Sequence, residues 1–241
     1  MNMNPNFANR EVSDMVMLDY ISKKPYLNVD FANATATDFT ATRVFAKGGQ
    51  GAPNRVGFDG ERTGTLKIST QIMPAKLFAM LSGGDIGTTC KSLKREVLTA
   101  TETSLTLSET PITGTVQVFK AEDDCGTAEE GASVKGTTVT VAAPGDYVVY
   151  YFVQREENVM NIKFNATNFP KAFEIHGKLP FKNEDDEIAI CELVYYRAVP
   201  QSTFSLSSSN TGDPTSIDIT FDCFADGNGD IYDMNFIDEA V

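Results

Sequence analysis

A single histidine limits the nucleophilic chemistry that this chain could carry out. A serine or cysteine nucleophile needs an imidazole beside it. His176 lies in the run KAFEIHGKLPF, where Phe173 and Ile175 alternate with polar residues. This alternation predicts that His176 lies on the polar face of a strand, which argues against a catalytic base. One histidine also excludes a histidine-rich metal site, so we expect neither a catalytic residue nor a metal ligand.

A glycine-rich acidic string near the end of the chain has the residue types of the first half of an EF-hand calcium loop. A full loop needs glycine at its sixth position and a bidentate acid at its twelfth, and here these positions hold Ile231 and Ile237. Asp-Gly and Asn-Gly are strong hairpin signals, and strand-like residues flank the string. We therefore predict a hairpin turn, with adventitious calcium binding as the alternative. The predicted turn comprises Asp226, Gly227, Asn228, Gly229 and Asp230.

Clusters of acids could supply the paired carboxylates of a glycoside hydrolase. They occur at 123–124, 129–130 and 184–187, in turn-rich segments without the aromatic platforms that sugars favour. The chain has no tryptophan at all. Solvated loops are the favoured interpretation, and a carboxylate-based hydrolase on a jelly-roll scaffold is kept only as the enzyme alternative.

The four cysteines are spread along the chain and form no Cys-x-x-Cys pair. Metal sites usually show close ligand pairs, and a disulfide scaffold would be smaller and denser in cysteine. We predict four free thiols, three of them buried and one, Cys125, in a polar loop. No cofactor is expected.

The formal net charge is −13, and no cluster of Lys and Arg is present. Stable DNA binding needs such clusters to contact phosphates, so direct DNA binding is disfavoured. No apolar run approaches the length of about 20 residues that crosses a bilayer. The N-terminus shows no secretory signal, which predicts synthesis in the cytoplasm and no membrane partner.

Alternating apolar residues indicate strands along most of the chain. The apolar residues of these runs include Leu27, Val29, Leu66, Ile68, Leu105, Leu107, Val116, Val118, Val139, Val141, Ile217, Ile219 and Phe221. Turn clusters separate them, as expected for a β-sandwich or barrel. One segment, at about residues 74–82, predicts a short α-helix, because Pro74 suits its first turn and Gly83 its end. The predicted fold class is all-β with this one helix.

The region at about residues 99–153 has a strand pattern of its own. It ends in APGDYVVYYFV, where a tyrosine after a tight turn could bond back to the chain, as in immunoglobulin-like domains. We predict one domain over residues 1–241, interrupted here by a long hairpin or a small immunoglobulin-like insertion.

A glycine-bearing segment at Ala46–Asp59 predicts a long loop. Compact domains seldom carry such a loop without a purpose. We expect it to be mobile in the monomer and ordered by a neighbouring subunit. The contact residues predicted in it are Lys47, Gly48, Gly49, Gly51 and Arg55.

The order of these segments resembles the tail tube proteins of contractile-tailed bacteriophages, the myophage type. The run GFDGERTGTLKISTQIMPAKLFAMLSGGDI is similar to a strand–helix unit of that family, and CKSLKREVLTATETSLTLSETPITGTVQVFK to the segment after it. The resemblance continues in PGDYVVYYFV and in the stretch from FPKAFEIHGKLPF to DGNGDIYDM. It spans roughly residues 38–236.

The resemblance implies a structural protein of the virion tail, made in the host cytoplasm, and no enzyme. Its subunits would stack as hexameric rings around a channel for DNA. The partners implied are the chain itself, a tail sheath protein, a tape measure protein and DNA in transit. We also expect a negatively charged channel, because repeated phosphate contacts would stall DNA. The structural alternative is another virion protein, such as a decoration protein or an immunoglobulin-like binding module.

Overall fold

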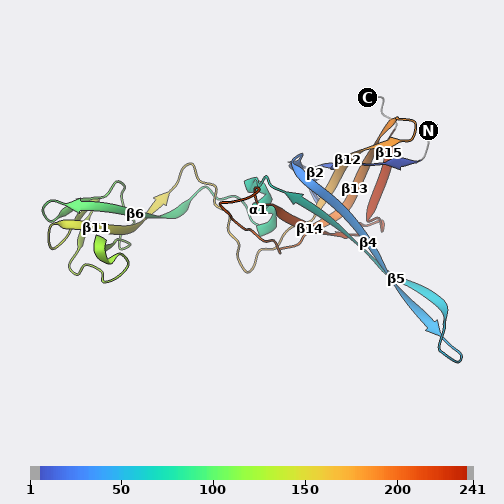
Figure 1. Ribbon diagram of the computed structural model, residues 1–241, viewed down its shortest axis with the longest axis horizontal. Helices are drawn as coiled ribbons and strands as arrows, with labels where there is room; N and C mark the ends of the chain where they lie inside the picture. The colour runs from blue at the N-terminus through green and yellow to red at the C-terminus, as the bar shows by residue number, and fades with distance from the viewer. Residues whose placement is uncertain (1–5, 238–241) are drawn as a thin grey trace. The chain divides into compact units, whose positions relative to one another are not determined.

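The computed structural model describes residues 6–237, and nearly all of its regular structure is antiparallel β-strand (Figure 1). The chain divides into two compact units. We call the first the body (Met1–Asp85 with Ile162–Val241) and the second the insertion (Ile86–Asn161). The all-β prediction with one short helix is confirmed.

The body is built on one nine-stranded sheet, in the order β3-β2-β12-β13-β14-β5-β4. In addition, β1 pairs with β12 and β15 pairs with β13. The strands are β1 (Phe7–Ala8), β2 (Asp14–Asp19), β3 (Pro25–Val29), β4 (Ala32–Lys47), β5 (Asn54–Thr70), β12 (Phe173–Asn183), β13 (Ile188–Pro200), β14 (Ile217–Phe224) and β15 (Tyr232–Ile237).

The alternation read from the sequence sends one set of side chains from these strands into a common core. Leu66 and Ile68 of β5 pair with Phe221 and Ile219 of β14, and all four are buried. Met17, Ile175 and Tyr195 continue this core face across β2, β12 and β13. The predicted apolar positions of the body strands therefore form a single core face, as a period of two requires.

The helix α1 (Ala75–Ser82) adds Leu77, Met80 and Leu81 to that core. It begins after Pro74 and ends at Gly83, as predicted. Gly83 has a φ of 67° and donates its N–H to the carbonyl of Met80. A Cβ atom there would lie 2.2 Å from the Phe169 carbonyl oxygen, so both conformation and space demand glycine.

The insertion has its own core between two three-stranded sheets, β6-β11-β8 and β7-β10-β9. Its elements are β6 (Cys90–Ala100), β7 (Ser104–Thr106), β8 (Gln117–Lys120), the 3-10 turn η1 (Ala121–Asp123), β9 (Ser133–Lys135), β10 (Thr138–Thr140) and β11 (Gly145–Arg155). The Tyr147 hydroxyl donates to the carbonyl of Ala143 at 2.8 Å, which is the back-bonding expected from the sequence. Gly87 and Asn161 exchange two backbone hydrogen bonds of 2.8 Å, which join the two ends of the insertion.

The strand pattern of the insertion begins earlier than residue 99. β6 starts at Cys90, and its partly buried positions include Lys94 and Glu96. Two of its apolar side chains, Leu93 and Val97, are 57% and 59% exposed, whereas Leu98 packs against the core. Because inner positions of β6 include the charged Lys94 and Glu96, its apolar pattern does not mark the face that it buries.

Candidate assembly surface

The outer parts of β4 and β5 project from the rest of the body as a two-stranded ribbon (Figure 1). We call residues 43–59 the arm. At its root a register shift separates Ala41 from Arg43, and the Arg43 side chain donates two hydrogen bonds to the Asp59 carboxylate. Apart from Gly48, every residue from 38 to 63 is exposed. The arm therefore has no hydrophobic core of its own.

One face of the arm is wholly apolar. Val44 pairs with Phe58, and Ala46 pairs with Val56, so the four side chains lie on the same side of the ribbon. Val44 is 68% exposed and Phe58 is 60% exposed. An isolated two-stranded ribbon is marginal in water, and an exposed apolar face marks an interaction surface. The arm consequently has the character of a surface that a partner covers.

The structure corrects the extent of the predicted contact loop. Strand pairing continues to Lys47 and Asn54, so only residues 48–53 form a turn and the rest of Ala46–Asp59 is strand. Of the predicted contact residues, Gly48, Gly49 and Gly51 lie in the turn, Lys47 ends β4, and Arg55 lies in β5. Arg55 donates from Nε to the Gly48 carbonyl at 2.9 Å. The missed signal was the run of aromatic and β-branched residues in RVF and RVGF, which favours strand.

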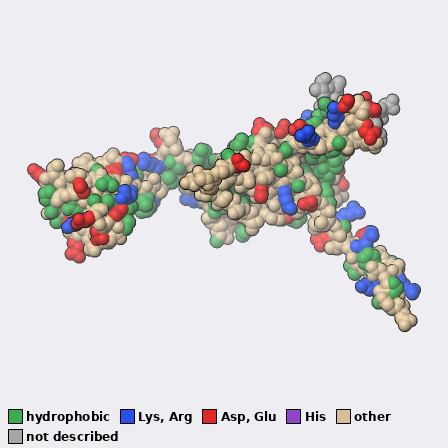
Figure 2. Space-filling view, in the orientation of Figure 1, with side chains coloured by type: hydrophobic (Ala, Val, Ile, Leu, Met, Phe, Trp, Pro, Cys, Tyr) green, Lys and Arg blue, Asp and Glu red, His purple; other side chains and the backbone are tan. Residues whose placement is uncertain are grey.

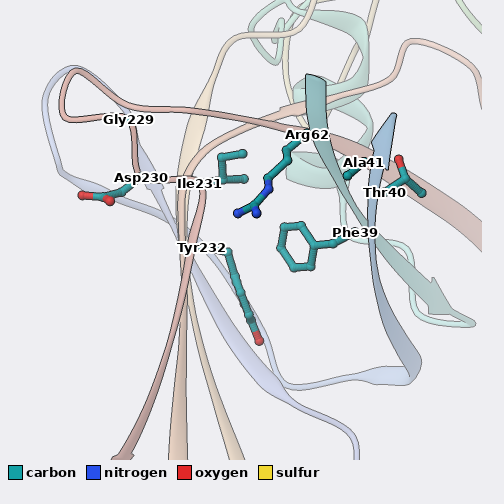
Figure 3. A pocket seen from close by; sticks show the side chains of 8 residues that line it. All are labelled: Phe39, Thr40, Ala41, Arg62, Gly229, Asp230, Ile231 and Tyr232. Carbon is teal, nitrogen blue, oxygen red and sulfur yellow. The ribbon is translucent and has the colours of Figure 1, made fainter. Parts of the chain in front are cut away.

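A groove of about 450 Å³ lies at the base of the arm (Figure 3). Its walls come from Phe39 of β4 and from Ile231 and Tyr232, where β15 begins. The ring centroids of Phe39 and Tyr232 are 5.1 Å apart. The Arg62 side chain points into the space between these apolar groups. Within residues 6–237, the Arg62 side chain donates no hydrogen bond and forms no ion pair, although its charge helps to lower the pKa of Asp59.

Tyr232 and Tyr195 supply neutral aromatic surface beneath this groove, with ring centroids 4.8 Å apart. Burial raises the pKa of Tyr195 to about 12, and it also raises the pKa of Tyr232. Both phenols are therefore protonated at neutral pH. The charges of the groove are those of Arg62 and, at its rim, Asp230.

The predicted DGNGD turn is present, but the hairpin is not. The Asp226 amide donates to the Asp230 carbonyl, and the Asp226 carboxylate accepts from the amides of Asn228 and Asp230. These backbone hydrogen bonds lower the pKa of Asp226. The remaining turn residues are the glycines Gly227 and Gly229.

The strands on either side of this turn, β14 and β15, both pair with β13 and not with each other. Phe224 pairs with Arg197, and Tyr232 pairs with Tyr195. The turn thus interrupts the pairing with β13, and the chain then pairs with β13 again further along that strand. Asp-Gly and Asn-Gly specify the turn, but they do not specify which strand its ends will meet.

The face of the body sheet opposite the core carries many charged residues, together with apolar ones such as Val16 and Phe224, and we call it the polar face. Paired residues lie on the same side of a sheet, so the registers identify the members of this face. The acidic residues on it are Asp14, Asp38, Glu174, Glu192, Asp218, Asp222 and Asp233. The basic residues on it are Lys67, Lys178, Lys182 and Arg197. Acids therefore outnumber bases on this face.

His176 lies on this polar face, as predicted. Its Nε2 is 2.8 Å from the Glu174 carboxylate and its Nδ1 is 3.6 Å from that of Glu192. Glu174 also pairs with Lys23. Burial alone would raise the pKa of Glu174, but the hydrogen bonds from Lys23 and His176 outweigh it and lower that pKa. Among the described residues, the hydrogen-bonding and ionic partners of the imidazole are Glu174 and Glu192, which are neighbours on the strand surface.

The cysteines of the described chain are all free. Cys191 and Cys223 are buried and Cys125 is exposed, as predicted, whereas Cys90 is only half-buried because it begins the edge strand β6. Within residues 6–237, no group of three or more His, Cys, Asp or Glu side chains is arranged to hold a metal ion. In the same range, no helix is both long and apolar enough to cross a membrane.

Comparison with protein families gives a match over most of the chain. The model described as the YomU/Tube protein family matches residues 9–234, a range that includes the body strands from β2 to β14, the start of β15 and the whole insertion. No curated protein matches the chain.

Proposed function

Because the chain belongs to the YomU/Tube family of phage tail tube proteins, we propose that its copies stack as hexameric rings into a hollow tube through which DNA leaves the virion. The protein is a structural component of the tail, and the ring and the channel are the parts of the proposal that go beyond family membership. The arm is the observation that carries this proposal.

The arm supports assembly because its apolar face has no partner within the described chain. Burial of apolar surface stabilises an assembly by roughly 25 cal/mol per Å². The side chains that a partner would bury here include Val44, Val56 and Phe58. A second copy is the proposed partner, since a tube is made of identical subunits. A contact between the arm of one copy and another surface of the next is heterologous, and such contacts close into rings or continue as tubes.

The edges of the body sheet support the same assembly. β3 and β4 are its outermost strands, and the outer edge of each has no strand partner among residues 6–237. An exposed edge is prone to unwanted pairing unless another strand covers it. In a closed ring, neighbouring copies cover these edges.

We propose that the polar face of the body sheet lines the channel. The core face is occupied by α1 and the buried cluster, which leaves the polar face as the sheet surface available to a lumen. Its excess of acids would repel DNA phosphates and let mobile cations fill the space between wall and DNA. A tape measure protein would occupy the same channel before DNA does.

The side of the body that carries α1 would then face outward. Phe78 of α1 contacts the ring of Phe204, which in turn contacts Phe164, with centroid distances of 6.1 and 5.3 Å. Phe164 is 53% exposed. We propose this aromatic surface as the contact for a tail sheath protein, if the tail is of the contractile type that the sequence resembles.

The insertion is proposed as an immunoglobulin-like module set into the tube domain. Its two small sheets, separate core and tyrosine hydrogen bond support this interpretation. Because its ends are joined at Gly87 and Asn161, the body needs no change in its own strands to accommodate it.

The assembly proposal is tested with the variant Val44→Asp/Phe58→Asp, which places charges on the apolar face of the arm. Val134→Asp is the matched control, because Val134 is an exposed strand valine (43%) in the insertion. We expect the native chain and the control to form rings or hollow tubes in negative-stain images and sedimentation. The double variant should remain a folded monomer with an unchanged circular dichroism spectrum. Tubes from the double variant, or a native chain that stays monomeric even beside other tail components, would refute the proposal.

A further inference from the structure

The groove at the base of the arm has the composition of a site for a carboxylate with an apolar neighbour. Arg62 presents a planar guanidinium, which binds carboxylates through two parallel hydrogen bonds. Phe39, Ile231 and Tyr232 surround it with apolar surface and exclude part of the water (Figure 3). Among residues 6–237 no carboxylate forms an ion pair with Arg62, so its hydrogen-bonding capacity is available to another molecule.

The charge distribution of the chain favours a second copy as that molecule. Residues 39–63 carry Arg43, Lys47, Arg55 and Arg62 against Asp59 and Glu61, a formal charge of +2. Because the whole chain carries −13, the remainder carries −15. In Figure 2, Lys and Arg side chains follow the arm, whereas acidic ones gather at the end of the body beside the termini. The arm and its base are thus attracted to the rest of another copy.

The turn between β12 and β13 offers the matching surface. It comprises Glu184, Asp185, Asp186 and Glu187 and leads into Ile188, which is 49% exposed. Asp186 pairs with Lys182 at 2.6 Å, and Glu187 accepts from the Asn183 side chain. Asp185 is exposed, and its backbone amide donates to the Asn183 side chain within the turn. The turn therefore presents an exposed acid, Asp185, three residues before an exposed apolar side chain, Ile188.

We propose that the groove of one copy receives the β12–β13 turn of a second copy, with the Asp185 carboxylate bound to Arg62 and Ile188 packed against the walls. This inference rests on the proposed function, since it names a contact between the assembling copies. The two surfaces are different parts of the chain, so the contact is heterologous and repeats from copy to copy. A charged contact of this kind fixes register and speeds association.

Charge reversal tests the pairing. Arg62→Glu and Asp185→Arg should each raise the concentration needed for assembly by about tenfold or more, because each places like charges together. The combined variant Arg62→Glu/Asp185→Arg should recover most of the loss, because the pair is restored in reverse. Lys135→Glu and Asp213→Lys are the matched controls on exposed sites elsewhere, and they should assemble as the native chain does. All variants are exposed positions, and circular dichroism checks that each remains folded.

A cysteine pair provides a second measurement on assembled protein. In a background with Cys125→Ser, the variants Arg62→Cys and Asp185→Cys are mixed, assembled and oxidised. A disulfide-linked dimer that forms only in the mixture is expected. If the native chain assembles but the double reversal does not restore assembly, or the linked dimer does not form, this pairing is overturned and the tube proposal remains intact. A native chain that never assembles overturns both.

Discussion

The arm and the insertion are two excursions from the same body, and they treat their apolar residues in opposite ways. In the insertion, Val139, Val149 and Tyr151 are completely buried between two sheets. In the arm, Val44 and Phe58 are more than half exposed. The insertion therefore buries its apolar side chains within one chain, whereas the apolar side chains of the arm would be buried only by a neighbouring copy. A segment that stays apolar without a core of its own points to assembly.

The largest effect is expected from a charge inside the insertion. Val139→Asp buries an unpaired carboxylate in the middle strand of the β7-β10-β9 sheet, at a cost of about 3–5 kcal/mol. Hydrogen–deuterium exchange resolved by peptide should show faster exchange throughout residues 86–161 and unchanged exchange in the body sheet. The same substitution in the arm, Val44→Asp, should change subunit stability by less than about 0.5 kcal/mol. Equal effects at the two sites would abolish the distinction between them.

Acid should weaken the insertion before it affects the arm. Burial alone would raise the pKa of Glu96, but hydrogen bonds from Ser108 and Tyr151, with Lys94 beside it, lower that pKa to about 2. A carboxyl whose pKa is lowered on folding stabilises the fold at pH values above its unfolded pKa of 4.5. This contribution is lost as the pH falls toward 2. The loss is on the order of 2–3 kcal/mol.

This acid effect is measured by unfolding the whole chain in denaturant at pH 5 and at pH 3. Hydrogen–deuterium exchange in peptides from the insertion reports the unfolding of that unit. Glu96→Gln removes the titrating group and should flatten the difference between the two pH values. An insertion in the native chain that is equally stable at both would show that Glu96 does not contribute in this way.

A smaller effect is expected at the tyrosine that closes the β10–β11 connection. Tyr147→Phe keeps the buried ring and removes the hydroxyl that donates to the Ala143 carbonyl at 2.8 Å. A net loss of about 1 kcal/mol is expected for one such hydrogen bond. Thermal melting of the insertion measures this loss.

The smallest effect is expected at the root of the arm. The Arg43–Asp59 ion pair is exposed on both sides, with side-chain exposures of 58% and 62%. Exposed pairs of this kind contribute little to stability and are screened by salt. Arg43→Ala should therefore leave the melting temperature of the body almost unchanged. A clear fall in that temperature would mean that the arm is held in place within one chain, contrary to the comparison above.

The sequence predicted what depends on local pattern. The helix between Pro74 and Gly83, the alternating core positions of β5 and β14, and the polar position of His176 follow from spacing and capping, and all are confirmed. The family resemblance is confirmed as well, although the family match does not specify a contractile tail.

The sequence failed where distant segments decide the outcome. Glycines near residues 48–51 suggested a long loop, yet pairing between β4 and β5 continues almost to the turn. The DGNGD turn suggested a hairpin, yet β13 lies beside both flanking strands. The groove around Arg62 went unnoticed because its walls come from segments near residues 40 and 231. Only the fold brings these segments together.

The most direct test of the account is an electron cryomicroscopy reconstruction of the assembled chain. We predict rings around an open channel, with Asp218 and Asp222 on its wall and acids in excess over Lys and Arg. The same map should show Val44 and Phe58 of each arm covered by another copy. A channel lined mainly by Lys and Arg, or arms whose apolar face remains in water, would contradict the account.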